Sequence, residues 1–98
     1  MKQITPNQVN DKLLSGETLN IIDVREVDEV KEGRIPTALN IPLGLLEFRI
    51  QELDKSKEYI MVCRSGGRSG RAASFLEGRG FKVINMSGGM LEWAGRVE

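Results

Sequence analysis

The chain has 98 residues, 40% of them apolar and 29% charged, which predicts one globular domain spanning residues 1–98. Fourteen basic and fourteen acidic residues cancel, so a global basic field for nucleic-acid binding is excluded. The single cysteine and the lack of histidine exclude an internal disulfide, a multi-cysteine zinc site and any nucleophile that is activated by an imidazole.

No apolar run approaches the ~20 residues that span a bilayer, and the chain does not open on a signal-type segment. We therefore expect a cytoplasmic protein with no membrane and no nucleic acid among its partners. We expect no cofactor and no metal, and nothing in the pattern demands more than a monomer.

Strand and helix patterns alternate from the N-terminus onward. Residues 2–4 predict a short strand, and Thr5 then begins a helix with Pro6 at its first position and Gln8 completing a capping box. Residues 19–24 form a mainly apolar run with β-branched members, which is typical of a strand buried on both faces.

The middle of the chain continues this alternation. The acidic residues 26–32 predict a short helix with a solvated face, and residues 39–41 predict a short strand between two prolines. Apolar residues at helical spacing predict a helix over residues 45–53. Residues 59–62 predict a second strongly buried strand.

The last third predicts a helix over residues 68–78 and a strand over residues 81–84. Ser87 is expected to cap a final helix that carries Met90 and Trp93 on one face. Because strands and helices alternate with short connections, the sequence predicts an α/β fold with a mostly parallel central sheet and helices on both faces.

The only cysteine, Cys63, follows the strand predicted over residues 59–62, and binding sites in such sheets form at the carboxyl ends of strands. Gly66 and Gly67 then allow a tight turn that directs successive N–H groups toward one centre. The next helix adds the positive end of its dipole. The whole motif is Cys63-Arg64-Ser65-Gly66-Gly67-Arg68-Ser69.

Arg64, Arg68 and Arg71 add positive charge, and no acidic residue occurs between Glu58 and Glu77. Such surroundings favour the thiolate, which is the nucleophilic form of cysteine. We hypothesise that Cys63 is a nucleophile activated by dipoles and arginines without a general base. The competing interpretation is a small buried hydrophobe, but the conjunction of cysteine, glycines, arginines and helix start favours a reactive site.

Four segments, in the right order, resemble the single-domain members of the rhodanese sulfurtransferase family. Arg34 stands where that family usually has histidine, and Thr37 where glycine is common; the histidine is not the family's catalytic group, so these departures concern packing or pocket charge. The segments are Asp23-Val24-Arg25-Glu26, Gly33 to Pro42, Cys63 to Ser69, and Gly80-Phe81 with Gly88-Gly89 and Trp93.

The resemblance implies a rhodanese-like fold and a sulfur shuttle. Cys63 would take the sulfane sulfur of a small anionic donor, thiosulfate or a persulfide, and pass it to cyanide or to a small-molecule or protein thiol. Arg64 would contact the anionic donor, and Arg68 would brace the loop or tune its field. Asp23 and Arg25 would hold the loop from the neighbouring strand end, or simply form a structural salt bridge. The N–H groups that would hold the donor belong to Arg64, Ser65, Gly66, Gly67, Arg68 and Ser69.

Two other functions remain open at this point. A cysteine phosphatase or arsenate reductase also uses a thiolate in an arginine-bearing loop, but those loops have five residues between cysteine and arginine, whereas Cys63 and Arg68 are separated by four. A second cysteine for arsenate reduction is absent from the sequence. A non-catalytic partner-binding or redox-sensing module is the other alternative, although inactive modules of this type usually lack the cysteine.

Overall fold

The computed structural model describes all 98 residues, and its strands form one five-stranded parallel sheet in the order β1-β5-β4-β2-β3. All four strand pairings are parallel, so the carboxyl ends of the strands share one edge of the sheet. This confirms the predicted α/β class. The strands are β1 (Lys2–Ile4), β2 (Asn20–Asp23), β3 (Leu39–Asn40), β4 (Glu58–Val62) and β5 (Lys82–Met86).

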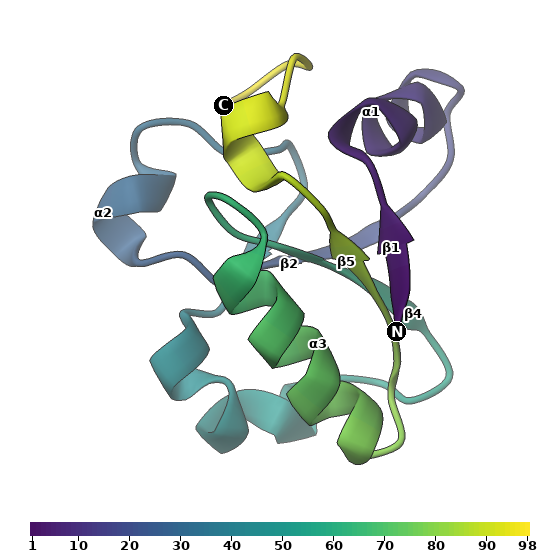
Figure 1. Cartoon of the computed structure of the whole chain (residues 1–98), viewed down its shortest axis with the longest axis vertical. Coiled ribbons are helices and arrows are strands. Elements are labelled where there is room, and N and C mark those ends of the chain that lie inside the picture. The colour runs from purple at the N-terminus through teal and green to yellow at the C-terminus, as the bar shows by residue number, and fades with distance from the viewer.

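Helices cover both faces of the sheet (Figure 1). The helix α3 lies on one face together with the short 3₁₀ helices η1 and η2, and α1 lies on the other face beside the 3₁₀ helix η3. No helix is long and apolar enough to cross a bilayer. The helical elements are α1 (Pro6–Leu14), α2 (Val27–Val30), η1 (Leu43–Leu45), η2 (Glu47–Glu52), α3 (Gly67–Gly78) and η3 (Gly89–Glu92).

Two buried clusters fill the spaces between the sheet and these helices, because successive residues of a strand point to opposite faces. Met61 on β4 and Cys63 directly after it pack toward α3, whereas Ile60 and Val62 of β4 belong to the cluster under α1. Both faces of β4 are therefore apolar, which explains its continuous hydrophobic run. The same alternation places the side chain of Cys63 on the α3 side of the sheet.

The predicted start of the first helix is confirmed. The Thr5 hydroxyl accepts a hydrogen bond from the Gln8 N–H at 3.1 Å, and the Gln8 side chain accepts one from the Thr5 N–H at 2.9 Å. This reciprocal pair satisfies two N–H groups that would otherwise lack partners at the helix terminus.

The helix predicted over residues 45–53 is wrong in type, because the segment folds as η1 and η2. Its hydrogen bonds join residues three apart, such as Arg49 N–H to the Leu46 carbonyl at 3.1 Å and Leu53 N–H to the Ile50 carbonyl at 3.0 Å. Leu46, Ile50 and Leu53 still face the core as the pattern requires. Apolar spacings of three and four residues suit both helix types, so the pattern alone did not distinguish them.

The last predicted helix is also corrected. It is the 3₁₀ helix η3, and Gly88, with φ of 79°, precedes it in place of a capping Ser87. The Ser87 hydroxyl donates instead to the Ile4 carbonyl at 3.3 Å. The N–H groups of Met90 and Leu91 are already used, since they donate to the carbonyls of Cys63 and Arg64 at 2.9 and 3.0 Å.

The turn formed by Gly88 and Gly89 therefore supports the backbone that follows β4. Gly89 has φ of 61°, a conformation that side chains other than glycine rarely adopt. A Cβ atom at this position would overlap the backbone carbonyl of Arg64. Glycine is required here because the two chain segments approach so closely.

We expect Gly89→Ala to lower the free energy of unfolding by at least about 2 kcal/mol, because it adds both backbone strain and overlap. Gly78→Ala is the matched control, since a Cβ there meets nothing within 4 Å and the residue lies at the end of α3. The control should remain within about 1 kcal/mol of the parent. Equal effects of the two substitutions in urea unfolding would contradict this account.

Candidate active site

Cys63 lies directly after β4 with its side chain 1% exposed, and the backbone of the following loop folds around its sulfur. The Gly66 N–H donates a hydrogen bond to the sulfur at 3.0 Å. The Ser69 hydroxyl, on the first turn of α3, lies 3.3 Å from it on the buried side. The sulfur is thus held from both the loop and the helix.

The two loop glycines have different roles. Gly66 has φ of 104° and precedes α3, and a Cβ there would come within 3.2 Å of the Gly88 nitrogen. Gly67 has no positive φ, and a Cβ there would meet nothing within 4 Å. The tight turn expected from the glycine pair therefore depends on Gly66.

The surroundings of the sulfur shift its ionisation in two opposite directions. Burial raises the pKa of Cys63, because it removes the thiolate from water. The Ser69 side chain and the N–H groups of Ser69, Gly66 and Ser65 act the other way, and together they hold the pKa of Cys63 below its ordinary value. The cradle consequently favours the nucleophilic form, as the loop geometry predicts.

The arginines contribute less to this effect than the sequence hypothesis proposed. Arg68 points away to α2, where its guanidinium forms a bidentate pair with Glu29 at 2.6 and 2.8 Å. Arg64 and Arg71 are exposed to solvent. Because one charge is neutralised by a carboxylate and the other two are screened by water, hydrogen-bond donors dominate the stabilisation of the thiolate.

Glu29 is a site residue that sequence reasoning missed, because the acidic run was interpreted as a solvated helix face. The hydrogen bond from Arg68 is the main reason why the pKa of Glu29 falls from 4.5 to about 2. Both side chains are 28% exposed. The pair joins α2 to the start of α3 and so fixes the outer end of the loop. The only signal in the sequence was that the arginines of the loop have no acidic residue near them in the chain, so an anionic partner had to come from elsewhere.

Asp23 and Arg25 form a buried ion pair at the end of β2, with 2.8 Å between guanidinium and carboxylate. Every hydrogen bond that the Asp23 carboxylate accepts comes from Arg25. Arg25 also donates to the carbonyls of Glu29 and Gly33 at 3.3 and 2.9 Å. The pair therefore ties the segment around α2 together, as the structural salt bridge alternative describes, and reaches the Cys63 loop only through Glu29.

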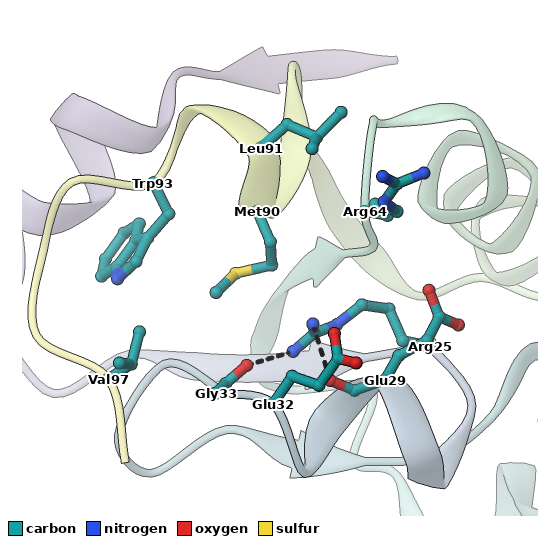
Figure 2. Close-up of a pocket in the computed structure, with 9 residues that line it drawn as sticks. All are labelled: Arg25, Glu29, Glu32, Gly33, Arg64, Met90, Leu91, Trp93 and Val97. Carbon is teal, nitrogen blue, oxygen red and sulfur yellow. Dashed lines mark hydrogen bonds between the residues drawn. The ribbon is translucent and has the colours of Figure 1, made fainter.

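A cavity of about 600 Å³ opens beside the loop (Figure 2). Figure 2 shows Arg25 and Glu32 below Met90, with Trp93 and Val97 at the left and Arg64 at the right. Arg64 lines the cavity, whereas Cys63 itself does not. The cavity offers cationic, acidic and apolar walls to a molecule that approaches the loop. Its lining consists of Arg25, Glu29, Glu32, Gly33, Arg64, Met90, Leu91, Trp93 and Val97.

Asn85, near the end of β5, is a second residue that sequence reasoning missed. Its side chain oxygen lies 2.6 Å from the Ser69 hydroxyl, and the residue is only 5% exposed. The predicted strand ended at residue 84, one position too early to place this side chain on the face that Cys63 occupies.

No group of residues is arranged to hold a metal ion.

Comparison with known proteins identifies the family. The model of the rhodanese-like domain matches residues 5–96. "Putative sulfurtransferase YtwF" of Bacillus subtilis is 42% identical over 98 residues, covering 100% of this chain and 95% of that protein. A protein of Allochromatium vinosum named "Sulfurtransferase" is 33% identical over 95 residues, covering 96% and 89%.

Solved structures agree with this assignment. The crystal structure of a rhodanese-like domain protein from Staphylococcus aureus matches with a TM-score of 0.94 and 34% identity, covering 100% of this chain and 97% of that one. The chain belongs to the rhodanese-like domain family. The resemblance drawn from its sequence motifs is thereby confirmed.

The pair of Glu29 and Arg68 generates a pH-dependent prediction. Because the pKa of Glu29 is lowered on folding, the pair stabilises the protein above pH 4.5, and this contribution is lost as the pH falls toward about 2. We expect Glu29→Gln to cost at most about 1 kcal/mol at pH 7, since the pair is partly exposed. The difference from the parent should shrink as the pH falls below 4.5 and be largely lost near pH 2.

Asp28→Asn is the matched control for this substitution. Asp28 is the neighbouring acid on α2, and its side chain is 98% exposed with a lysine nitrogen 3.9 Å away. Its substitution should leave unfolding nearly unchanged at every pH. A Glu29→Gln cost that stays constant from pH 7 to pH 2 would rule out the ion pair as its cause.

Proposed function

We propose that this protein is a sulfurtransferase in which Cys63 carries a sulfane sulfur as a persulfide. The observation that carries the proposal is the hydrogen bond of 3.0 Å from the Gly66 N–H to a sulfur whose pKa is lowered by its surroundings. Membership of a family whose relatives are named sulfurtransferases supports it. No imidazole is needed for this role, because the N–H groups of the loop favour the thiolate by lowering the pKa of Cys63.

The reaction balances in two displacement steps. The Cys63 thiolate attacks the outer sulfur of thiosulfate, a bond forms between the two sulfurs, and the bond to the sulfite group breaks so that sulfite leaves with its electron pair. An acceptor thiolate, or cyanide, then attacks the outer sulfur of the Cys63 persulfide. The Cys63 thiolate is released as the leaving group, and a new persulfide or thiocyanate departs. A persulfide donor follows the same course, with a thiolate leaving in place of sulfite.

Arg64 is the residue that we assign to the anionic donor. Its side chain is exposed and lines the cavity, while its carbonyl is fixed by the Leu91 N–H at 3.0 Å. The volume of about 600 Å³ lies in the range of small-molecule sites, and so it accommodates organic persulfides as well as thiosulfate. The N–H groups of residues 64–69 would hold the transferred sulfur beside Cys63.

The loop size separates this function from phosphate-ester hydrolysis. Four residues stand between Cys63 and Arg68, and Arg68 is committed to Glu29 by a bidentate pair. A loop that binds a tetrahedral phosphate needs its arginine to face the bound anion. Because Arg68 faces α2, the arrangement suits a single sulfur atom better.

We further propose that the protein acts as a cytoplasmic monomer.

Mass spectrometry of the intact protein provides the direct test of the carrier step. After incubation with thiosulfate, we expect the parent protein to gain the mass of one sulfur atom, and Cys63→Ser to gain none. The bound sulfur should be removed by a thiol or by cyanide. Turnover of a phosphate ester by a protein that takes up no sulfur would overturn the assignment.

Steady-state kinetics test the role of Arg64. We expect Arg64→Ala to lower kcat/KM for thiosulfate by about five- to tenfold, because the hydrogen bond from the guanidinium to the anionic sulfur donor is lost. The matched control is Arg79→Gln, at the far end of α3, where the guanidinium lies 4.7 Å from the centre of the Phe75 ring. Equal kinetic losses in the two variants would show that Arg64 acts only through the general charge of the surface.

A further inference from the structure

The polar groups behind Cys63 offer fewer hydrogen-bond donor protons than acceptor atoms. Asn85 lies on β5 opposite Met61 of β4, so its side chain extends toward the same face of the sheet as that of Cys63. Its amide nitrogen donates to the Gly66 carbonyl at 3.3 Å and to the Gln3 side chain at 3.2 Å. With the nitrogen used in this way, the atom that faces Ser69 is the amide oxygen, which can only accept.

The Ser69 hydroxyl carries one proton and has three acceptors within reach. The Asn85 oxygen lies 2.6 Å away, the Gly66 carbonyl 3.2 Å, and the Cys63 sulfur 3.3 Å. The shortest of these distances places the proton on the side of Asn85. The Ser69 oxygen then remains free to accept the S–H of a protonated Cys63.

Ionisation of the thiol changes what the sulfur requires. A thiolate has no proton to donate and is stabilised by donors, so the Ser69 hydroxyl serves it only by turning away from Asn85. The thiol and the thiolate therefore need opposite orientations of one hydroxyl. Since Ser69 is fully buried and Asn85 is 5% exposed, water does not readily replace the partner that is lost.

We propose that Asn85 is a positioning residue that sets the reactivity of Cys63 by competing with its sulfur for the single proton of the Ser69 hydroxyl. In the resting protein Asn85 holds that proton and restrains ionisation. When negative charge develops on the sulfur, the hydroxyl turns toward it. In the second step of sulfur transfer, a role that rests on the proposed function, the same hydroxyl stabilises Cys63 as the leaving thiolate.

Other charged groups also surround the sulfur, and the alanine variants described next leave all of them in place. Arg64 and Arg68 come from the loop and α3, and the charge of Arg68 acts on Cys63 while being paired with Glu29. Further charged groups on the elements packed against the loop include Arg71 on α3, Asp23 and Arg25 at the end of β2, Glu26 before α2, and Glu92 on η3.

The test measures the ionisation of Cys63 directly, through the pH dependence of alkylation by iodoacetamide and the ultraviolet absorbance of the thiolate. Cys63 is the only cysteine, so both signals belong to it. We expect Asn85→Ala to raise the thiolate-to-thiol ratio at a fixed pH by about three- to tenfold, because a competing acceptor is removed. Asn85→Asp should lower the ratio, because a carboxylate holds the Ser69 proton more strongly and adds a like charge.

A double-mutant cycle separates this role from a structural one. Ser69→Ala should lower the thiolate-to-thiol ratio, and in that background Asn85→Ala should have no further effect. Gln3→Ala is the control, because Gln3 is exposed and its loss leaves the Asn85 oxygen in place. We expect the control to titrate like the parent protein.

Two results would overturn the proposal. One is an effect of Asn85→Ala that persists in the Ser69→Ala background, and the other is a change in the same direction for Asn85→Ala and Asn85→Asp. If Asn85→Ala does not fold, Asn85→Asp is compared with and without Ser69→Ala, and an equal effect in both backgrounds, as the like charge alone would give, overturns the proposal. Alkylation requires no sulfur donor, so a failure of sulfur transfer would leave this result intact and would count only against the proposed function.

Discussion

The hydrogen bond from the Gly66 N–H to the sulfur of Cys63 is the contact on which the rest of the site depends. It forms at 3.0 Å only because Gly66 has φ of 104°, which turns the loop back over the end of β4. This turn relies on the close approach of Gly88 and Gly89. The residues that follow them donate hydrogen bonds to the carbonyls of Cys63 and Arg64. The buried sulfur therefore depends on two glycine turns, one at Gly66 and one at Gly88 and Gly89. Loss of either turn would displace the N–H donors around the thiol.

Much of the fold could be predicted because each strand leaves a simple trace in the sequence. Residues 59–62 are apolar on both faces and residues 19–24 mainly so, and a parallel sheet covered by helices on two sides buries such runs. The capping box at Thr5 was equally clear, since its two hydrogen bonds lie within four residues. The 3₁₀ segments were not predictable in type, because Leu46, Ile50 and Leu53 suit either kind of helix.

The candidate site was predictable where its parts are contiguous and unpredictable where they come from separate elements. Cys63, Gly66 and Ser69 lie within one loop and helix start, so their proximity follows from the chain. Glu29 and Asn85 are 39 and 16 residues away from their partners, and only the order of the strands brings them to the loop. For the same reason, the sequence hypothesis gave the arginines too large a part in activating the thiol. The partner of Arg68 is Glu29 on α2, which lies far from it in the sequence.

The pair of Glu29 and Arg68 has a mechanical consequence beyond its charge. Glu29 sits on a wall of the cavity, and Arg68 stands at the outer end of the loop that surrounds the sulfur. Arg25 donates to the carbonyls of Glu29 and Gly33, so these parts of the cavity wall are joined by hydrogen bonds. A molecule bound in the cavity would therefore contact a wall that is connected to the Cys63 loop by the ion pair of Glu29 and Arg68. The same side chain, Glu29, thus belongs both to the lining of the cavity and to the support of the loop around the sulfur.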